Sequence, residues 1–104
     1  MQHKSWTLPF VWLSSAGELM RLDNASGNLG IGTSSPAAKL DVDGTLKSTV
    51  YTVATLPVAA TTAGQRSFVS DATATHAAGI GTTVTGGGAN FVPVYSDGTN
   101  WIIG

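Results

Sequence analysis

The sequence predicts an all-β chain of short hairpins and Gly-rich loops, and three observations support that fold class. First, apolar and polar residues alternate in Lys39–Asp43, so Leu40 and Val42 share one face of an extended strand. Second, glycines, prolines and two Asp-Gly pairs divide the chain into short apolar runs. Third, Thr45–Val58 is rich in Thr, Val and Tyr, residue types that favour extended strands.

Residues 1–23 are predicted to form an aromatic hairpin. Ser14–Gly17 has the small and polar residues that are typical of a turn. Pro9 cannot donate a hydrogen bond to a neighbouring strand, so its strand is expected at a sheet edge or at a bulge. The side chains that would share one face of that strand are Trp6, Leu8, Phe10 and Trp12.

Residues 24–62 are predicted to form a shaft-like β segment. Its first part, Asn24–Pro36, holds three glycines, two asparagines, three serines and a proline, which favour a reversal of the chain. Asp43–Gly44 follows the strand at Leu40–Val42 and indicates a two-residue hairpin. Thr45–Val58 is rich in Thr, Val and Tyr, which favours a strand over a short helix.

Residues 63–104 are predicted to form a small C-terminal β module. Asp97–Gly98 is expected to join the last two strands as a hairpin. Pro93 has no N–H to donate, so its strand is expected at an edge or with a bulge. Ala72–Asn90 is almost wholly Ala, Thr and Gly, and we expect a long loop that is either functional or mobile. The three expected strands are Arg66–Ser70, Phe91–Tyr95 and Asn100–Ile103.

The composition predicts self-association. Charged residues make up 11% of the chain, well under the roughly 25% that is usual for a soluble domain. Much of the 42% hydrophobic content is alanine and valine, and aromatic residues are only 8%, so the core of a lone chain would be thin. Because the chain has no cysteine and no obvious metal site, oligomerisation is the remaining common route to stability.

Two parts of the sequence resemble bacteriophage tail-fibre and other phage appendage proteins. The first comprises MRLD at Met20–Asp23, SGNLGIGTSSP at Ser26–Pro36 and AKLDV at Ala38–Val42, and it covers about a quarter of the chain. The second comprises AGQRSFVSDA at Ala63–Ala72 and GGGANFVPVYSDGTNW at Gly86–Trp101, and it is similar to the ends of such proteins. The two parts stand in the usual order.

The resemblance implies a non-enzymatic structural protein of a phage virion, an elongated and short homotrimeric fibre that serves as a spacer or adhesin in host attachment. Residues 1–23 would then be a candidate virion-attachment segment, and the partners would be other tail or capsid proteins and a host surface glycan. Three alternatives stay open: a head-decorating fibre, a glycan-binding module that works as a monomer, and a polysaccharide-degrading spike fragment. The last lacks the paired carboxylates on neighbouring strands that glycoside hydrolysis usually requires.

The resembled fibres are trimers, so apolar strand faces are expected to meet across a threefold axis. The residues predicted for this trimer core are Leu40, Val42, Phe68, Val92, Val94 and Trp101. A glycan would instead be contacted by residue types that stack on sugars and hydrogen-bond their hydroxyls. The candidates for that role are Tyr95, Asp97, Thr99 and Asn100, with a plain turn at residues 97–100 as the alternative.

Other kinds of chemistry are not favoured by the sequence. A net charge of −1 without a basic cluster argues against nucleic acid, and no apolar run reaches the roughly 18 residues of a membrane span. We predict no cofactor and no metal site, because Asp41–Gly44 matches only the start of a calcium loop and neither His3 nor His76 has a neighbour at ligand spacing. A triad of His76, Asp71 and a serine lacks a nucleophile elbow.

Overall fold

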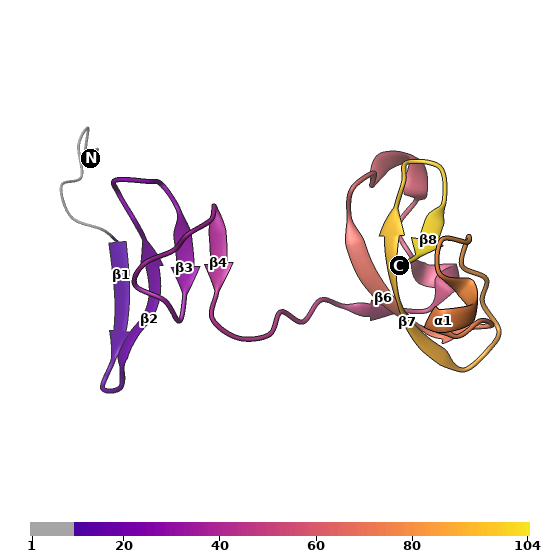
Figure 1. Ribbon diagram of the computed structural model, residues 1–104, viewed down its shortest axis with the longest axis horizontal. Helices are drawn as coiled ribbons and strands as arrows, with labels where there is room; N and C mark the ends of the chain where they lie inside the picture. The colour runs from indigo at the N-terminus through magenta and orange to yellow at the C-terminus, as the bar shows by residue number, and fades with distance from the viewer. Residues whose placement is uncertain (1–9) are drawn as a thin grey trace. The chain divides into compact units, whose positions relative to one another are not determined.

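The computed structural model describes residues 10–104, which are mostly β. They form two four-stranded mixed sheets, one short α-helix and two short 3-10 helices (Figure 1). The β class predicted from the sequence is therefore confirmed. The chain divides into two compact units, of which the first ends at Leu46 and the second is Lys47–Gly104. The two segment boundaries expected from the sequence, after residues 23 and 62, both lie inside a unit.

The first unit is built on one sheet with the strand order β1-β2-β3-β4. β1 and β2 form the expected hairpin around Ser14–Gly17, and β2 and β3 are antiparallel, which confirms the reversal after Asn24. β3 and β4 run parallel. Trp6, Leu8 and Pro9, on which the predicted aromatic face also depends, lie outside the described residues. The strands are β1 (Phe10–Ser14), β2 (Gly17–Leu22), β3 (Leu29–Ile31) and β4 (Leu40–Val42).

The strand register of the first sheet places eight apolar side chains on one face. Residues that are paired across neighbouring strands share a face, as do residues two apart along one strand. The rings of Phe10 and Trp12, for example, lie 5.0 Å apart between their centroids. We call this surface the open apolar face, and its two rows are Phe10, Leu22, Leu29 and Leu40, and Trp12, Met20, Ile31 and Val42.

Part of the opposite face of the first sheet is covered by the loop between β3 and β4. The connection between β3 and β4 folds back over Gly30, where a Cβ atom would lie 2.6 Å from the carbonyl oxygen of Thr33. Gly30 is buried, and only glycine fits so close an approach. On the same face the Asp41 carboxylate accepts a hydrogen bond of 2.8 Å from the N–H of Ala37. The loop therefore shields the part of this face around Gly30 and Asp41, and no second layer made of described residues packs on the apolar face.

The second unit is built on a sheet with the strand order β5-β6-β7-β8. β5 and β6 run parallel, and the other two pairs are antiparallel. The three strands expected in the C-terminal module are confirmed, and so is the hairpin at Asp97–Gly98. The elements are β5 (Val50–Tyr51), η1 (Val53–Thr55), η2 (Ala59–Thr61), β6 (Arg66–Ala72), α1 (His76–Gly79), β7 (Asn90–Ser96) and β8 (Trp101–Ile103).

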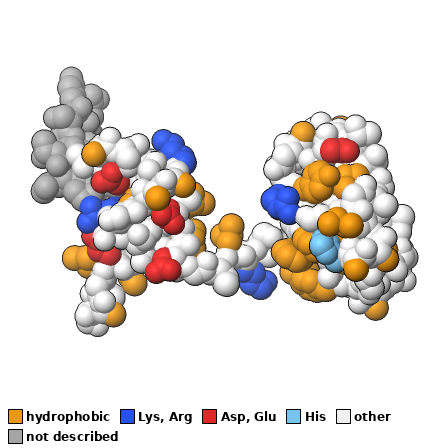
Figure 2. Space-filling view, in the orientation of Figure 1, with side chains coloured by type: hydrophobic (Ala, Val, Ile, Leu, Met, Phe, Trp, Pro, Cys, Tyr) orange, Lys and Arg blue, Asp and Glu red, His pale blue; other side chains and the backbone are white. Residues whose placement is uncertain are grey.

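The core of the second unit lies on one face of its sheet. It consists of Val69, Ala72, Val84, Val92, Val94, Trp101 and Ile103. The partly buried side chains of Tyr51, Val53, Leu56, Ala59 and Ala74 pack against it. On the other face Phe68 and Phe91 stay exposed, with their ring centroids 5.5 Å apart. Figure 2 shows broad hydrophobic areas with few charged side chains on the visible side of this unit.

Two sequence predictions for the middle of the chain are wrong. No hairpin forms at Asp43–Gly44, because the next strand, β5, pairs with β6 and not with β4. The strand expected within Thr45–Val58 is reduced to the two residues of β5. After β5 the chain turns into η1, where the side chains of Thr52 and Thr55 form a capping box. The pairing that decides this region is with a strand distant in sequence, which local patterns do not reveal.

Pro93 lies in an internal strand, so the prediction of an edge strand is also wrong. β7 runs between β6 and β8, and Pro93 is opposite Phe68. The Pro93 carbonyl accepts a hydrogen bond of 3.0 Å from the N–H of Gly104, so the proline nitrogen also faces the end of β8. That position lies beyond the last residue pair of the β7–β8 ladder, where a missing donor is tolerated. An irregularity does occur, but in β6, between Val69 and Ala72.

The segment between β6 and β7 is folded against the sheet, although the sequence predicted a long loop. It contains α1, and the buried side chain of Val84 belongs to the core. The N–H of Val84 donates to the Trp101 carbonyl at 2.9 Å, and the N–H of Thr73 donates to the Thr85 carbonyl at 2.9 Å. Backbone hydrogen bonds hold this segment, which explains why its Ala, Thr and Gly composition gave no sign of its order.

Candidate functional site

The open apolar face keeps large side chains in contact with solvent. Trp12 is 47% exposed and Leu40 is 51% exposed, and none of the eight side chains is buried by the described residues. Soluble monomers rarely expose contiguous apolar patches larger than a few hundred Å². A sheet of this size also needs to pack one face against another layer to be stable. The open apolar face is therefore a candidate contact surface.

The six residues predicted for a trimer core have different surroundings in the structure. Leu40 and Val42 belong to the open apolar face. Phe68 is 39% exposed on the outer face of the second sheet. The remaining three are buried within the core of a single chain, so their side chains present little surface to another copy: Val92, Val94 and Trp101.

The residues predicted to contact a glycan lie in or next to the turn between β7 and β8. The Asp97 carboxylate accepts hydrogen bonds from the N–H groups of Asn100 (2.7 Å) and Thr99 (2.8 Å). These bonds, above all the one from Asn100, hold the pKa of Asp97 below its usual range. Tyr95 is half-buried in β7, with the Arg66 guanidinium 5.9 Å from its ring centroid. One oxygen of the Asp97 carboxylate is thus engaged within the turn.

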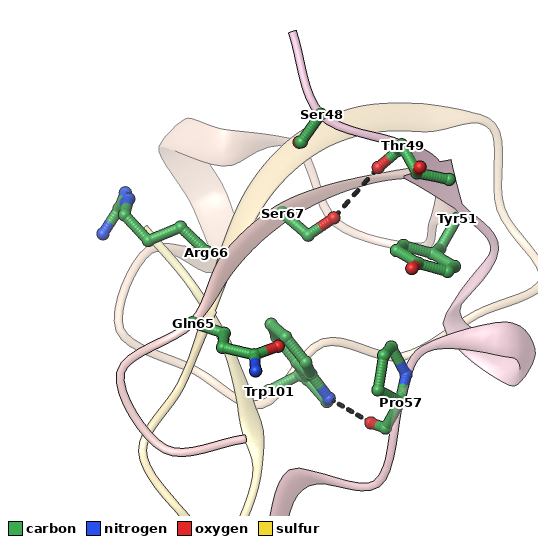
Figure 3. A pocket seen from close by; sticks show the side chains of 8 residues that line it. All are labelled: Ser48, Thr49, Tyr51, Pro57, Gln65, Arg66, Ser67 and Trp101. Atoms are coloured by element: carbon green, nitrogen blue, oxygen red, sulfur yellow. Dashed lines mark hydrogen bonds between the residues drawn. The ribbon is translucent and has the colours of Figure 1, made fainter. Parts of the chain in front are cut away.

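A pocket of about 200 Å³ lies within the second unit, in a place that the sequence did not indicate (Figure 3). Residues 48–51 at β5 form one side, and residues 65–67 at the start of β6 form the other. Trp101 and Pro57 complete the lining. The Trp101 indole N–H donates to the Pro57 carbonyl at 2.7 Å, which fixes the orientation of the ring.

The polar side chains of the pocket differ in how they are engaged. Ser67 donates to the Thr49 carbonyl at 3.0 Å and so ties the two sides together. The side chains of Ser48, Tyr51 and Gln65 make no hydrogen bond to another described residue. Figure 3 shows the Tyr51 hydroxyl and the Gln65 amide directed toward the space beside Trp101. Two polar groups are therefore available to a molecule bound in the pocket.

Arg66 lines the pocket, but its charged end is directed away from it (Figure 3). The guanidinium donates to the Gly104 carbonyl at 2.6 Å and lies over the Tyr95 ring. Arg66 is the one charged residue in the lining of this pocket. The space next to Trp101 is accordingly polar but without a charge.

The residues considered for metal or nucleophilic chemistry serve other purposes where the structure describes them. Within residues 10–104 no group of three or more His, Asp or Glu side chains could hold a metal ion. Asp71 accepts a hydrogen bond of 2.9 Å from the N–H of Val53 and so anchors η1 beside β6. His76 is exposed in α1, and His3 lies outside the described residues. None of the helices in the described part of the chain has the length and apolar character that a membrane crossing requires.

Comparisons with models of protein families, with curated proteins and with solved structures give no match. Ser48, Tyr51 and Gln65 were missed at the level of sequence, because only the pairing of β5 with β6 brings them to one pocket. The prediction that Trp101 belongs to an apolar core is the one sequence signal near this site, and it does not indicate the pocket beside this residue.

Proposed function

We propose that this chain is a structural protein of a phage virion, a short homotrimeric fibre that acts as a spacer or adhesin in host attachment. The observation that carries the proposal is the open apolar face of the first sheet. The resemblance to phage appendage proteins supports it from the sequence. The first resembling part includes the end of β2 and all of β3 and β4, and it supplies every residue of the open apolar face except Phe10 and Trp12.

Burial of the open apolar face would provide the free energy for assembly. Full burial of a Val, Leu, Ile, Phe or Met side chain contributes roughly 1.5 to 3 kcal/mol. Eight side chains of this face remain partly or largely exposed in one chain, and none of them is charged. The face offers no charged group that would select a different partner, so a second copy of the same face is a fitting cover.

A closed trimer would bury the open apolar face of every copy. The loop over Gly30 covers part of the opposite side of the first sheet, so the open apolar face is the large apolar surface that this sheet offers for association. Three such faces around an axis would form a common core and leave the loops outside. Proteins with few charged residues and no disulfide commonly gain stability in this way.

The second unit is suited to be the part of the adhesin that contacts other molecules. Its core is complete within one chain, so its fold does not depend on covering the open apolar face. Its pocket and its β7–β8 turn then remain available for contacts with other molecules. These features support different roles for the two units: the first would assemble the fibre, and the second would present a surface for binding other molecules.

The proposal is tested on phage particles. We expect antibodies raised against the full chain to label an external appendage of purified particles from cells that carry the gene, as seen by electron microscopy. Pre-immune serum is the control. We also expect added protein to slow adsorption of the phage to its host. Particles that lack the chain altogether would overturn the proposal, and label on the head would favour a head-decorating fibre.

A further inference from the structure

We infer that the pocket beside Trp101 binds the ring of a neutral saccharide. This inference deepens the adhesin function proposed above and rests on it, because it names the chemical class that the displayed unit would recognise. It moves the expected sugar contact away from the β7–β8 turn to a site formed by residues that are distant in sequence.

The size of the pocket fits one small ring. A water molecule in the liquid occupies about 30 Å³, so a volume of about 200 Å³ corresponds to roughly seven waters. Pockets for drug-sized ligands start near 300 Å³. The pocket is thus too large for a single ordered water and too small for an extended ligand, and its size suits a single sugar unit or the end of a chain.

The walls of the pocket combine the two surfaces that a sugar ring needs. A sugar has apolar C–H faces and polar hydroxyls at its edge. Pro57 and the small part of Trp101 that stays exposed, 7% of its surface, supply an apolar wall, and the hydrogen bond between them holds the indole in a fixed orientation. A preoriented aromatic ring loses little entropy when a ligand packs against it.

The polar groups around this wall are free to bind hydroxyls. The Tyr51 hydroxyl and the Gln65 amide point toward the space beside Trp101, and neither is engaged by another described residue (Figure 3). A hydroxyl and an amide can each both donate and accept hydrogen bonds, which matches the dual character of sugar hydroxyls. Ser48 offers a further free hydroxyl in the lining.

The absence of a directed charge in this pocket argues for a neutral sugar. The guanidinium of Arg66 is held by the Gly104 carbonyl and the Tyr95 ring, outside the pocket. An acidic saccharide would find no positive charge aimed at it. The turn at Asp97 is the competing site, but one oxygen of its carboxylate already bonds to Thr99 and Asn100 within the turn.

The test is a titration of the full chain, labelled with ¹⁵N, with glucose, galactose, mannose and N-acetylglucosamine, each followed by two-dimensional NMR. We expect at least one of these sugars to shift the Trp101 indole N–H and the Gln65 side-chain amide in a saturable way. Trp101→Phe assigns the indole signal. Tyr51→Phe and Gln65→Ala should each weaken binding by about two- to tenfold, as expected for one lost hydrogen bond. Thr99→Ala, in the turn, is the control and should bind as the unchanged protein does.

Two results would overturn the inference: no saturable shift with any of the four sugars, or shifts that centre on Thr99 and Asn100 and survive Gln65→Ala. Sialic acid at the same concentrations tests the expected neutrality, and tighter binding of this acid than of all four neutral sugars would contradict it. The native mass of the NMR sample separates this question from the fibre proposal. A trimer that binds no sugar refutes the pocket alone, whereas a monomer that binds sugar refutes the trimeric fibre alone.

Discussion

Trp101 packs into the core of the second unit with 7% of its surface exposed, and its indole also donates to the Pro57 carbonyl. Trp101→Ala would leave a cavity and an unpaired carbonyl. We expect this change to lower the free energy of unfolding by about 3 to 5 kcal/mol, measured by urea denaturation. Phe91→Ala is the matched control, since its ring is 60% exposed and loses mainly its contact with Phe68, worth about 1 kcal/mol. Equal losses in the two variants would contradict this placement.

The hydrogen-bonded carboxylate of Asp97 predicts that the stability of the fold depends on pH. Hydrogen bonds from Asn100 and Thr99 hold the pKa of the folded carboxyl below its ordinary value of 3.8. Because the folded pKa is the lower one, the carboxylate contributes stability above the unfolded pKa, and this contribution is lost as pH falls through the folded pKa. A ¹³C titration should therefore place the Asp97 carboxyl pKa below 3.8.

Asp97→Asn is the control for this titration. Its amide oxygen can still accept hydrogen bonds but has no proton to take up at low pH. The stability difference between the unchanged protein and this variant should shrink as the pH is lowered through the folded pKa. A midpoint at or above 3.8 for Asp97 would mean that the turn does not hold the ionised carboxylate as the structure describes.

The two Asp-Gly pairs of this chain show how far local signals predict its elements. Asp97–Gly98 makes the expected hairpin, because the strands on either side of it are neighbours in the sheet. Asp43–Gly44 has the same dipeptide after an equally clear strand, yet the chain continues to β5 and a different sheet. The two turn residues are the same in both cases, so they do not by themselves decide whether a hairpin forms. What differed was the partner of the following strand, which depends on contacts that are distant in sequence.

The candidate sites show the same limit. The strand at Leu40–Val42 and its apolar side were predictable from alternation alone. The pocket beside Trp101 was not, because β5 has only two residues and its pairing with β6 runs parallel across η1 and η2. The burial of Trp101 was also predicted, but the core around it comes from one chain. Patterns within a strand are encoded locally, whereas pairing between strands is not.

The segment between β6 and β7 gives a prediction for an element. Its backbone is hydrogen-bonded to itself and to β8, and Val84 is buried. We therefore expect the amides of Thr73, Val84 and Ile103 to exchange with deuterium far more slowly than in an unstructured peptide, measured by NMR. The exposed amide of Ala89, which has no hydrogen bond assigned in the structure, is the internal reference for rapid exchange. Rapid exchange of the Val84 amide would mean that this segment is a mobile loop, as its composition suggested.

At the scale of the whole molecule, the low content of charged residues and the open apolar face point to the same conclusion. Charged residues are 11% of the sequence, and eight apolar side chains share one face of the first sheet on which none of them is buried by the described residues. Composition predicted self-association, but only the strand register shows which surface is available for it. The number of copies comes from the resemblance and stays a prediction.

Leu40→Glu tests the role of the open apolar face in assembly. It places a charge on the open apolar face, and we expect it to weaken association by about 2 to 5 kcal/mol per chain, measured by sedimentation over a dilution series. Leu46→Glu is the matched control, because Leu46 is 79% exposed and lies outside both sheets. It should assemble as the unchanged protein does. Equal assembly of the two variants would show that this face is not the contact.

The most direct test of the proposed assembly is the native mass of the unchanged chain, measured by sedimentation equilibrium from micromolar concentrations upward. Shared burial of the open apolar face predicts a species with three times the 10.6 kDa of one chain. A folded species with the mass of one chain at every concentration would contradict it.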